Sequence, residues 1–475
     1  MANATTYPWT PGFYAGDRPR IVTSRFEYED SHTLTRYLAT EGYEGLKAAL
    51  AKPAPDVHEE VKNATVLGRG GAGFPAGTKW GLTPPGVFPR YLVVNGDESE
   101  PGTYKDRLLM ERDPHQLIEG CLIACYAAGL SQCFLYIRGE MPDAHERVGT
   151  ALNEAYAAGY VGKNILGTNF SVDIVLHWGA GAYVVGEETA LIESLEGNRG
   201  MPRLKPPYFP AAIGLYGQPT IVNNVETLAN LPWLLRNGAE EYLKIGTPTS
   251  PGTRMEAISG HVNRPGVFEV INGTTTYRDL IYGEEFSNGI RDGHELKAFV
   301  PGGGSAPWFV ADQLDLPLEG RLVGAAGSMV GSGAVMVMDE TTDIPKAALT
   351  LTRFYAHESC GKCTPCREGG TWLSRILERV CAGRGTMRDL DQLIEVGETI
   401  CPGAFPHASS ERLGLEAVPF PYKMTTICFV GPSAYAPVHS ALTLFRDEFE
   451  AKIVKRTSIP VSAAPIDVEP IGAPA

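Results

Sequence analysis

Tyr91–Leu–Val–Val–Asn–Gly–Asp–Glu–Ser–Glu100 begins with apolar residues and ends in a run of polar ones. The apolar half predicts a short buried strand over Tyr91–Val94. Polar side chains just beyond a strand's carboxyl end lie where α/β sheets bind ligands. Asn and Asp can fix heterocycle edges and ribosyl or ribityl hydroxyls, and Glu100 suits a hydroxyl or an amide better than a phosphate. The alternative for this stretch is an acidic solvated turn.

The residues that follow alternate between helix and strand patterns. The expected segments are a helix His115–Ala128, a strand Cys133–Ile137, a helix Ala144–Ala158 and a strand Val172–His177. This βαβ alternation implies a largely parallel sheet, and so an α/β fold class.

A glycine-rich stretch, Gly68–Trp80, precedes the strand. Its glycines let backbone N–H groups approach a ligand closely, which is how phosphates are cradled. Arg69 and Lys79 add positive charge, while Phe74 and Trp80 offer ring faces. The spacing is not the G-x-G-x-x-G dinucleotide fingerprint, and no hydrophobic strand runs directly into it. The alternative is a mobile glycine-rich loop.

Three later segments carry further binding features. Gly179–Leu191 is a glycine turn that opens a helix, and its backbone donors suit an anion or a flavin edge. Arg203–Pro210 places cations beside aromatic faces on a proline-braced loop. Asn223–Thr227 provides side-chain amides at the start of another helix. Taken singly, each is also compatible with an ordinary turn or helix cap.

Cys360, Cys363 and Cys366 form a C-x-x-C-x-x-C motif. Three thiolates at this spacing favour an iron–sulfur cluster, which takes four thiolates, over zinc, which usually binds two separated pairs. A disulfide is disfavoured, because the close spacing strains a bridge. Cys401 and Cys428 are both candidates for the fourth ligand, and spacing alone does not choose between them.

The other cysteines of the first half, Cys121, Cys125 and Cys133, fall on apolar faces, where we expect buried small hydrophobes.

The composition excludes several classes of protein. With 475 residues, 43% hydrophobic and 20% charged, the chain fits a globular protein of two to four domains. A net charge of −14 argues against nucleic-acid binding. The start of the sequence has no apolar signal core, and no run of about 18 apolar residues is present to span a membrane. We therefore expect a cytoplasmic protein in a reducing compartment, without direct membrane insertion.

The remaining sequence divides into further units. Helices are expected at Thr33–Leu50 and Val57–Ala64. Residues 253–320 contain short strands, beginning at Met255, Gly266 and Leu296, and a small helix Tyr277–Tyr282, which predicts a β-grasp-like α+β domain. From Thr350 onward the pattern is helical, with helices at Leu373–Val380, Leu390–Val396 and Val438–Ile453, and so predicts a small bundle around the cysteines.

Four motifs occur together and in order: 68–80, 95–107, 186–191 and 358–369. Together they resemble the flavoprotein subunit of respiratory complex I, the NADH:quinone oxidoreductase, over roughly residues 40–450. The resemblance implies hydride transfer from NADH to FMN, followed by single-electron transfer to a 4Fe–4S cluster and onward through partner Fe–S subunits to quinone in a translocase complex. No side chain need act as an acid or base.

The resemblance also implies a domain order. The expected units are a helical lead-in (1–65), a Rossmann-like FMN- and NADH-binding domain (66–248), a ubiquitin-like, SLBB-type β-grasp domain (249–335), a helical bundle that carries the 4Fe–4S cluster (336–455) and a flexible tail (456–475).

The family's binding residues map onto matching positions of this sequence. For FMN these are Gly68, Arg69, Gly70, Gly71, Lys79, Asn95, Asp97, Ser99, Tyr183, Gly186, Glu187, Asn223, Asn224 and Thr227. For NADH they are Gly71, Phe74, Glu100, Glu188, Lys205 and Tyr208. The cluster ligands implied are Cys360, Cys363, Cys366 and Cys428, because Cys428 precedes the family's next characteristic segment, which ends in Phe445–Glu448.

Three departures from the family pattern stand out. Lys205–Pro210 is one residue longer than the family's Lys-Pro-Pro-Phe-Pro, so either Tyr208 or Phe209 could meet the nucleotide. Leu82 stands where some members have a second aromatic. An insertion runs from Cys401 up to Cys428.

The resemblance implies two partners, a small thioredoxin-like 2Fe–2S subunit and a large Fe–S subunit. The complex would hold the chain peripherally on the cytoplasmic face of the inner (plasma) membrane. Competing interpretations are the diaphorase subunit of an NAD-linked hydrogenase or formate dehydrogenase, a cluster-bearing scaffold without nucleotide binding, and a non-redox zinc module.

Overall fold

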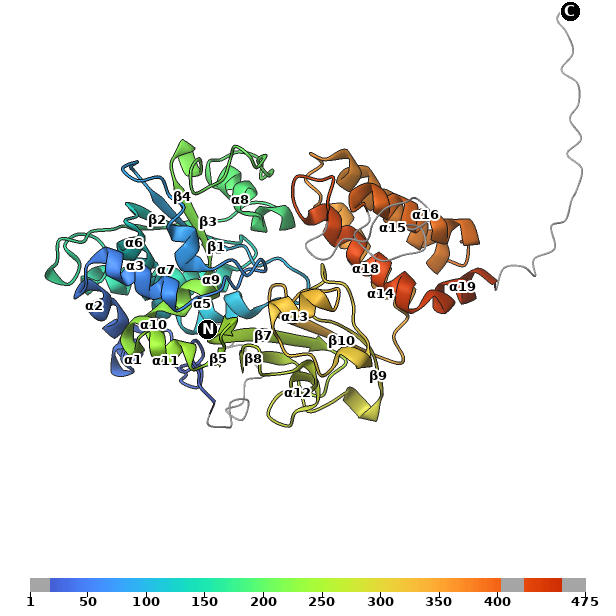
Figure 1. The fold of residues 1–475 in the computed structure, drawn as a ribbon, viewed down its shortest axis with the longest axis horizontal. Coiled ribbons are helices and arrows are strands. Elements are labelled where there is room, and N and C mark those ends of the chain that lie inside the picture. The colour runs from blue at the N-terminus through green and yellow to red at the C-terminus, as the bar shows by residue number, and fades with distance from the viewer. Residues whose placement is uncertain (1–17, 403–422, 455–475) are drawn as a thin grey trace, which may run out of the picture.

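The computed structural model describes residues 18–402 and 423–454. The expected tail at 456–475, the start of the lead-in and most of the insertion between Cys401 and Cys428 lie outside the described residues. Figure 1 shows a first sheet with its helices at one end, the C-terminal helices at the other, and a second sheet beside both.

The first sheet has four strands, β1 (Tyr91–Gly96), β2 (Gln132–Ile137), β3 (Ile174–Trp178) and β4 (Thr220–Asn224), in the order β3-β2-β1-β4. Every pairing in it is parallel. This confirms the predicted α/β class with a parallel sheet. Strand β4 was not expected from the sequence. Asn224 was correctly placed at a helix start, since it caps α9, whereas Asn223 lies within β4.

Helices surround this sheet. They are α1 (Leu34–Ala39), α2 (Glu44–Leu50), α3 (Ala54–Asn63), α4 (Ala76–Trp80), α5 (Lys105–Arg112), α6 (Pro114–Ala128), α7 (Pro142–Ala157), α8 (Glu188–Leu195), α9 (Val225–Ala229), α10 (Leu231–Asn237) and α11 (Ala239–Leu243). Nearly all of α6 is buried, and Cys121, Cys125 and Cys133 pack in the same core. The prediction that these three thiols are core residues is confirmed.

The helix expected over Thr33–Leu50 is wrong as a single element. It breaks into α1 and α2 at Glu41 and Tyr43, whose φ angles are 62° and 60°. The break is stabilised by Glu119 of α6, whose buried carboxylate accepts hydrogen bonds from the N–H groups of Tyr43 (2.7 Å) and Leu46 (2.8 Å). A tertiary contact therefore overrides the local helix propensity.

The second sheet is mixed. Its strands are β7 (Thr253–Gly260), β8 (Gly266–Ile271), β9 (Leu296–Val300) and β10 (Ala334–Asp339), in the order β8-β7-β10-β9. The hairpin β7–β8 and the pair β10–β9 are antiparallel, while β10 runs parallel to β7. Helices α12 (Tyr277–Tyr282) and α13 (Gly320–Ala325) accompany it, and a short ribbon of β5 (Gly246–Thr247) and β6 (Ser250–Pro251) precedes it. Three of the four strands and α12 were expected from the sequence, but β10 was not.

The C-terminal helices are α14 (Ile344–Glu358), α15 (Thr364–Cys381), α16 (Met387–Ile400), α18 (Val430–Leu444) and α19 (Arg446–Val454). In α15 the buried Leu373, Ile376, Leu377 and Val380 fall on one helical face, as the 3.6-residue period requires. The helix expected at Val438–Ile453 starts earlier, includes Pro437, and breaks at Phe445.

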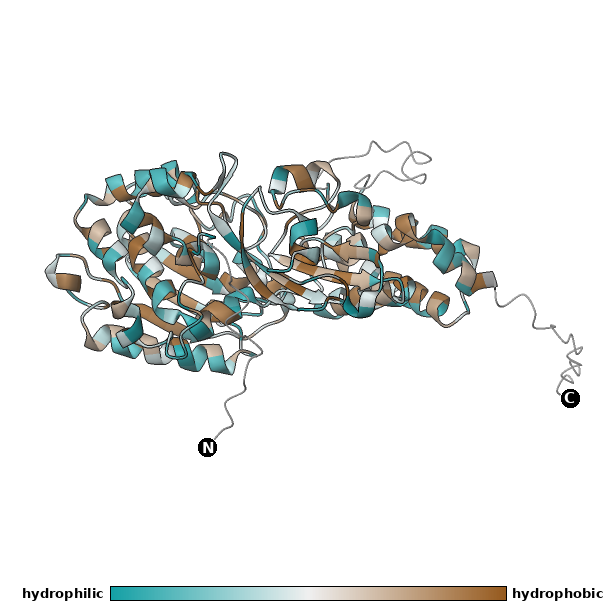
Figure 2. Cartoon of the chain, turned by 90° about the horizontal axis from the view of Figure 1, so that it is seen from below, coloured by the Kyte–Doolittle hydropathy of each residue, from teal (hydrophilic) through white to brown (hydrophobic). Residues whose placement is uncertain are grey.

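Figure 2 shows hydrophobic residues concentrated along the strands, while the helices carry both hydrophobic and hydrophilic residues. No helix within residues 18–402 and 423–454 is both long and apolar enough to cross a membrane.

Candidate functional site

The glycine-rich loop connects α3 to α4 close to the carboxyl ends of β1 and β4. An isolated bridge between Leu67 and Pro75 closes its base, where the N–H of Gly68 donates to the carbonyl of Phe74 (3.0 Å). Gly71 and Gly73 have φ angles of 120° and 67°, which L-residues rarely adopt. A Cβ added at Gly73 would have no heavy atom within 4 Å. The loop thus offers bare backbone to open space, as a phosphate cradle needs.

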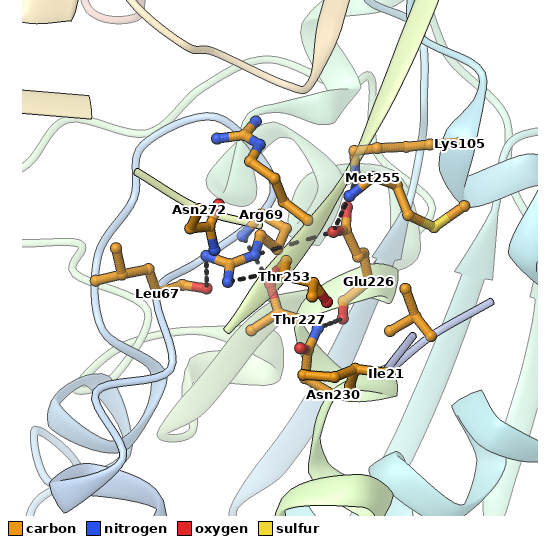
Figure 3. Close-up of polar contacts among 12 residues, drawn as sticks. Ile21, Leu67, Arg69, Lys105, Glu226, Thr227, Asn230, Thr253, Met255 and Asn272 are labelled. Carbon is orange, nitrogen blue, oxygen red and sulfur yellow. Dashed lines mark hydrogen bonds and ion pairs between the residues drawn. The ribbon is translucent and has the colours of Figure 1, made fainter. Parts of the chain in front are cut away.

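Arg69 anchors this loop from beneath. Its side chain is buried, and its guanidinium donates to the carbonyls of Leu67 (3.1 Å) and Thr253 (2.9 Å), as Figure 3 shows. Its main-chain N–H donates to the Thr227 hydroxyl (2.9 Å). These contacts fix the loop on β7, and a contact from Arg69 to FMN stays a prediction.

Polar side chains gather at the carboxyl end of β1. The Asn95 amide donates to the carbonyl of Gly186 (2.9 Å), and the Ser99 hydroxyl lies 3.5 Å from the carbonyl of Tyr183. The Oδ1 atom of Asp97 is buried, with no hydrogen-bond partner among the described residues. Burial raises the pKa of Asp97 to about 6. A buried carboxylate oxygen without a donor is costly, so this position fits a ligand hydroxyl such as those of a ribityl chain.

Four charged residues predicted to bind FMN or NADH meet at the start of α8. Lys205 pairs with Glu187 (2.7 Å) and Glu188 (2.9 Å), and Lys79 lies 3.5 Å from Glu188. Burial raises the pKa of Glu188, but Lys79 and Lys205 outweigh it and hold that pKa below its ordinary value. Glu187 also caps α8, accepting from the N–H groups of Thr189 and Ala190.

β4 carries the two predicted asparagines into the site. The Trp80 indole N–H donates to the Asn223 side-chain oxygen (2.9 Å), and Lys79 donates to the carbonyl of Val222 (3.1 Å). Asn224 donates from its amide to Asp106 (2.6 Å). Asp106 had no expected role, since nothing in the sequence pattern shows that it returns to β4.

Glu100 lies where three parts of the chain meet. Its carboxylate accepts hydrogen bonds from the Tyr183 hydroxyl (2.5 Å), the Tyr355 hydroxyl of α14 (3.0 Å) and the N–H of Ser305 (2.7 Å). Burial raises the pKa of Glu100, and the hydrogen bonds from Tyr183 and Ser305 oppose this rise. Ser305 and Tyr355 were not expected here, because they are more than 200 positions away in the chain.

The aromatic candidates are exposed. Phe74 is 44% exposed, Tyr208 43% and Phe209 53%. Tyr208 lines an open groove of about 710 Å³ together with Arg203, Tyr216 and Lys362. Its role in stacking on a nucleotide therefore stays a prediction.

The four cysteines predicted as ligands share one apolar cluster. Cys366 and Cys428 pack with Val184 and Val185, and Cys360 and Cys363 pack against the same group. The N–H of Ile427 points to the Cys363 sulfur (3.3 Å), the kind of donor that tunes iron–sulfur sites.

Cys401 lies elsewhere. It ends α16 and packs in the core of the C-terminal helices with Tyr435. The four predicted ligands thus share one apolar cluster with a sulfur-directed N–H, whereas Cys401 belongs to another, and their assignment to a 4Fe–4S cluster stays a prediction.

Comparison with known proteins identifies the chain's relatives. The "Nuo51 FMN-binding domain" family matches residues 61–233, and the "NADH-ubiquinone oxidoreductase-F iron-sulfur binding region" matches residues 346–452. The F subunit of NADH-quinone oxidoreductase of Streptomyces coelicolor is 46% identical over 437 residues, covering 92% of this chain and 91% of the relative. The protein of the same name in Mycobacterium tuberculosis H37Rv is 45% identical, covering 91% of this chain and 93% of the relative. The chain belongs to the family of NADH-quinone oxidoreductase F subunits.

This membership confirms the resemblance found in the sequence, and the two matched regions support FMN and a 4Fe–4S cluster as cofactors of this NADH-quinone oxidoreductase F-subunit homologue. Among solved structures, a chain of the NAD+-reducing NiFe hydrogenase in its H2-reduced state superposes with a TM-score of 0.74 at 33% identity. The match covers 92% of this chain and 67% of the hydrogenase chain. The fold of the family is thus shared with a hydrogenase component.

Proposed function

We propose that this chain is the electron-input subunit of an NADH:quinone oxidoreductase, which oxidises NADH at an FMN site and passes electrons to a 4Fe–4S cluster. One observation carries the proposal. The short helix η3 (Tyr183–Gly186) supplies two predicted FMN contacts at its ends, while its Val184 and Val185 pack on Cys366 and Cys428. One four-residue segment therefore separates the predicted flavin site from the predicted cluster ligands.

FMN, when bound, supplies the conversion of a two-electron hydride donor into single electrons. The chain's own residues position it. Gly68, Gly70 and Gly71 present backbone to the phosphate, with Lys79 nearby for charge. Asp97 accepts a ribityl hydroxyl through its unpartnered oxygen. Asn95, Ser99, Glu187, Asn223, Asn224 and Thr227 complete the polar wall, and Arg69 holds the loop in place.

For NADH, we propose that Lys205 and Glu188 hold the polar groups of the nucleotide, and that Phe74 and Tyr208 offer ring faces. Glu100 orients the nicotinamide end of the bound NADH. Its three donors fix the carboxylate before the nucleotide arrives, so little side-chain entropy remains to be lost on binding.

The finer architecture belongs to the same proposal. The strand order and directions of the second sheet support a β-grasp, SLBB-type domain at 249–335, between the Rossmann-like unit at 66–248 and a helical cluster-bearing unit at 336–455. The proposed partners are a thioredoxin-like 2Fe–2S subunit and a large Fe–S subunit. The complex would hold the chain on the cytoplasmic face of the inner membrane.

A second candidate is the diaphorase subunit of an NAD-linked hydrogenase, which the structural likeness to the hydrogenase chain favours. The higher identity to the NADH-quinone oxidoreductase relatives, with over nine-tenths of each relative covered, favours the quinone-linked assembly. Purifying the native assembly and assaying NADH oxidation with a quinone and with hydrogenase substrates separates the two.

The test of the main proposal is low-temperature EPR of the anaerobically purified chain before and after addition of NADH, with dithionite as the reference reductant. We expect NADH to bleach the flavin absorbance and to produce a paramagnetic signal from the flavin or the cluster. A cluster that dithionite reduces, in a chain whose flavin does not respond to NADH, would contradict the proposal and favour a scaffold.

A further inference from the structure

Glu226, in the first turn of α9, is a fully buried carboxylate with no role expected from the sequence. It contacts three separate segments, as Figure 3 shows. Its Oε1 accepts a hydrogen bond from the N–H of Met255 on β7 (2.8 Å) and lies 3.9 Å from Arg69 Nε. Its Oε2 lies 2.6 Å from Lys105 Nζ. One side chain therefore contacts the glycine-rich loop, the start of α5 and the second sheet.

Resting on the proposed function, we infer that Glu226 is a positioning residue for the FMN site. It fixes the glycine-rich loop through Arg69, and the amide of Asn224 through Lys105 and Asp106, against strand β7.

The connection to Asn224 is continuous. Lys105, which is buried, donates to Asp106 Oδ1 (2.9 Å), and Asp106 Oδ2 accepts from the Asn224 amide (2.6 Å). The Asn224 oxygen in turn accepts from the N–H of Thr227 (3.3 Å). These two bonds set which way the amide faces, and leave its second N–H and second lone pair for a ligand.

The connection to the loop is an ion pair rather than a hydrogen bond, with Arg69 Nε 3.9 Å from Glu226. The same guanidinium donates from Nη2 to the Thr253 carbonyl of β7 (2.9 Å). Gly70 packs on Asn224, since a Cβ on Gly70 would lie 3.1 Å from the Asn224 Cβ. The two groups of predicted FMN contacts therefore touch each other and share Glu226 as their common anchor.

Buried ion pairs are weak contributors to stability, because desolvation offsets their attraction, and they are often replaceable by apolar residues. Here a network of charged and amide side chains runs from buried ion pairs to predicted ligand contacts. A role in holding the predicted ligand contacts in place explains such a network better than a contribution to folding stability does. If the network holds the ligand contacts in place, a charge-neutral replacement should weaken flavin binding. If the network only stabilises the fold, the same replacement should leave flavin binding unchanged.

The test uses the full-length chain stripped of flavin, titrated with FMN and followed by flavin fluorescence, with thermal unfolding and the midpoint potential of the bound flavin as further readouts. The variants are Glu226→Gln and the charge-neutral pair Lys105→Met with Glu226→Gln. The control is Glu119→Gln, an equally buried carboxylate that accepts three hydrogen bonds from α1, α2 and their connection but touches no predicted FMN contact.

We expect both Glu226 variants to bind FMN roughly tenfold more weakly, equivalent to about 1.4 kcal/mol, and to shift the potential of the bound flavin. Glu119→Gln should lower the unfolding temperature yet keep both the affinity and the potential. The neutral pair decides the case if Glu226→Gln alone fails to fold, because Glu226 and Lys105 lose their charges together, while Asp106 loses Lys105 but still accepts from the Asn224 amide.

A neutral-pair variant with unchanged FMN affinity and potential would overturn the inference and reduce Glu226 to a structural role. An unaltered chain that binds no FMN would instead overturn the proposed function, and this inference with it.

Discussion

Asp97 and Glu100 are two carboxylates three residues apart, and their surroundings give them opposite properties. Glu100 accepts three hydrogen bonds from within the chain. Asp97 keeps one buried oxygen without a donor among the described residues. A carboxylate whose oxygens accept hydrogen bonds from the chain is held in one position. A buried carboxylate oxygen without a donor favours binding of a ligand group that can donate to it.

Asp97 predicts a pH dependence of the flavin-free protein. Burial raises its pKa from 3.8 to about 6, so the folded state holds a proton that the unfolded chain has released. The stability from this group is complete below about pH 4 and is lost as the pH rises through about 6. Asp97→Asn should therefore stabilise the flavin-free chain at pH 8 by at most about 3 kcal/mol, while weakening FMN binding. Urea unfolding at pH 4 and 8 measures the difference, and a variant less stable than the parent at pH 8 would contradict it.

Glu100→Ala tests the nucleotide side. We expect a higher KM for NADH with the flavin content unchanged. Glu100 accepts from the hydroxyl of Tyr183, a predicted FMN contact, but the main chain of Tyr183 is held separately, since its N–H donates to Glu358 (2.7 Å). The ratio of flavin to protein, from absorbance, is measured beside steady-state kinetics. Loss of flavin from the variant would move Glu100 to the FMN side of the site.

At the scale of elements, two glycine-rich segments from different parts of the fold face each other. A Cβ on Gly71 would lie 3.9 Å from the carbonyl carbon of Gly331, and one on Gly303 would lie 2.6 Å from the Glu100 Cγ. The loop that follows β9 therefore lies against Glu100, and the loop that precedes β10 faces the glycine-rich loop at Gly71. Glycine is required in these loops because neighbouring atoms lie too close for a Cβ, and because the backbone adopts positive φ angles.

Gly303→Ala and Gly327→Ala form a matched pair for this idea. Both glycines have left-handed φ angles, 97° and 90°, so both variants should lose about 1–2 kcal/mol from backbone strain. Gly303→Ala should lose a further 1–3 kcal/mol, roughly, because its Cβ meets Glu100, whereas a Cβ on Gly327 meets nothing within 4 Å. Chemical denaturation measures both, and equal losses would show that the Glu100 contact is not constraining.

At the scale of the whole molecule, the cysteine site joins distant parts of the chain. Three thiols come from the α14–α15 connection and the start of α15, and the fourth precedes α18. Val184 and Val185, which precede α8, belong to the same apolar cluster as these thiols. A cluster held here would cross-link the C-terminal helices next to the predicted flavin contacts.

Cys428→Ser and Cys401→Ser separate the two ligand candidates. We expect Cys428→Ser to lose the cluster, because its thiol lies with the other three, and Cys401→Ser to retain it, because Cys401 packs in a different core. Iron content and the EPR spectrum of the dithionite-reduced chain measure the outcome. A full cluster in Cys428→Ser would assign the fourth ligand to Cys401.

Part of this protein was determined by the sequence alone. The strand Tyr91–Val94, the βαβ alternation, the glycine-rich loop and the C-x-x-C-x-x-C motif are local patterns, because strand period, backbone freedom and ligand spacing are properties of neighbouring residues. Only the tertiary structure decided the rest. Contacts with Glu119 interrupt the first predicted helix, and β4 and β10 form only as paired strands. In the folded chain Cys428, and not Cys401, lies in the cluster with the other three thiols. Ser305 and Tyr355 lie against Glu100. Each depends on contacts between residues far apart in the chain, and such contacts form only when separate elements pack together.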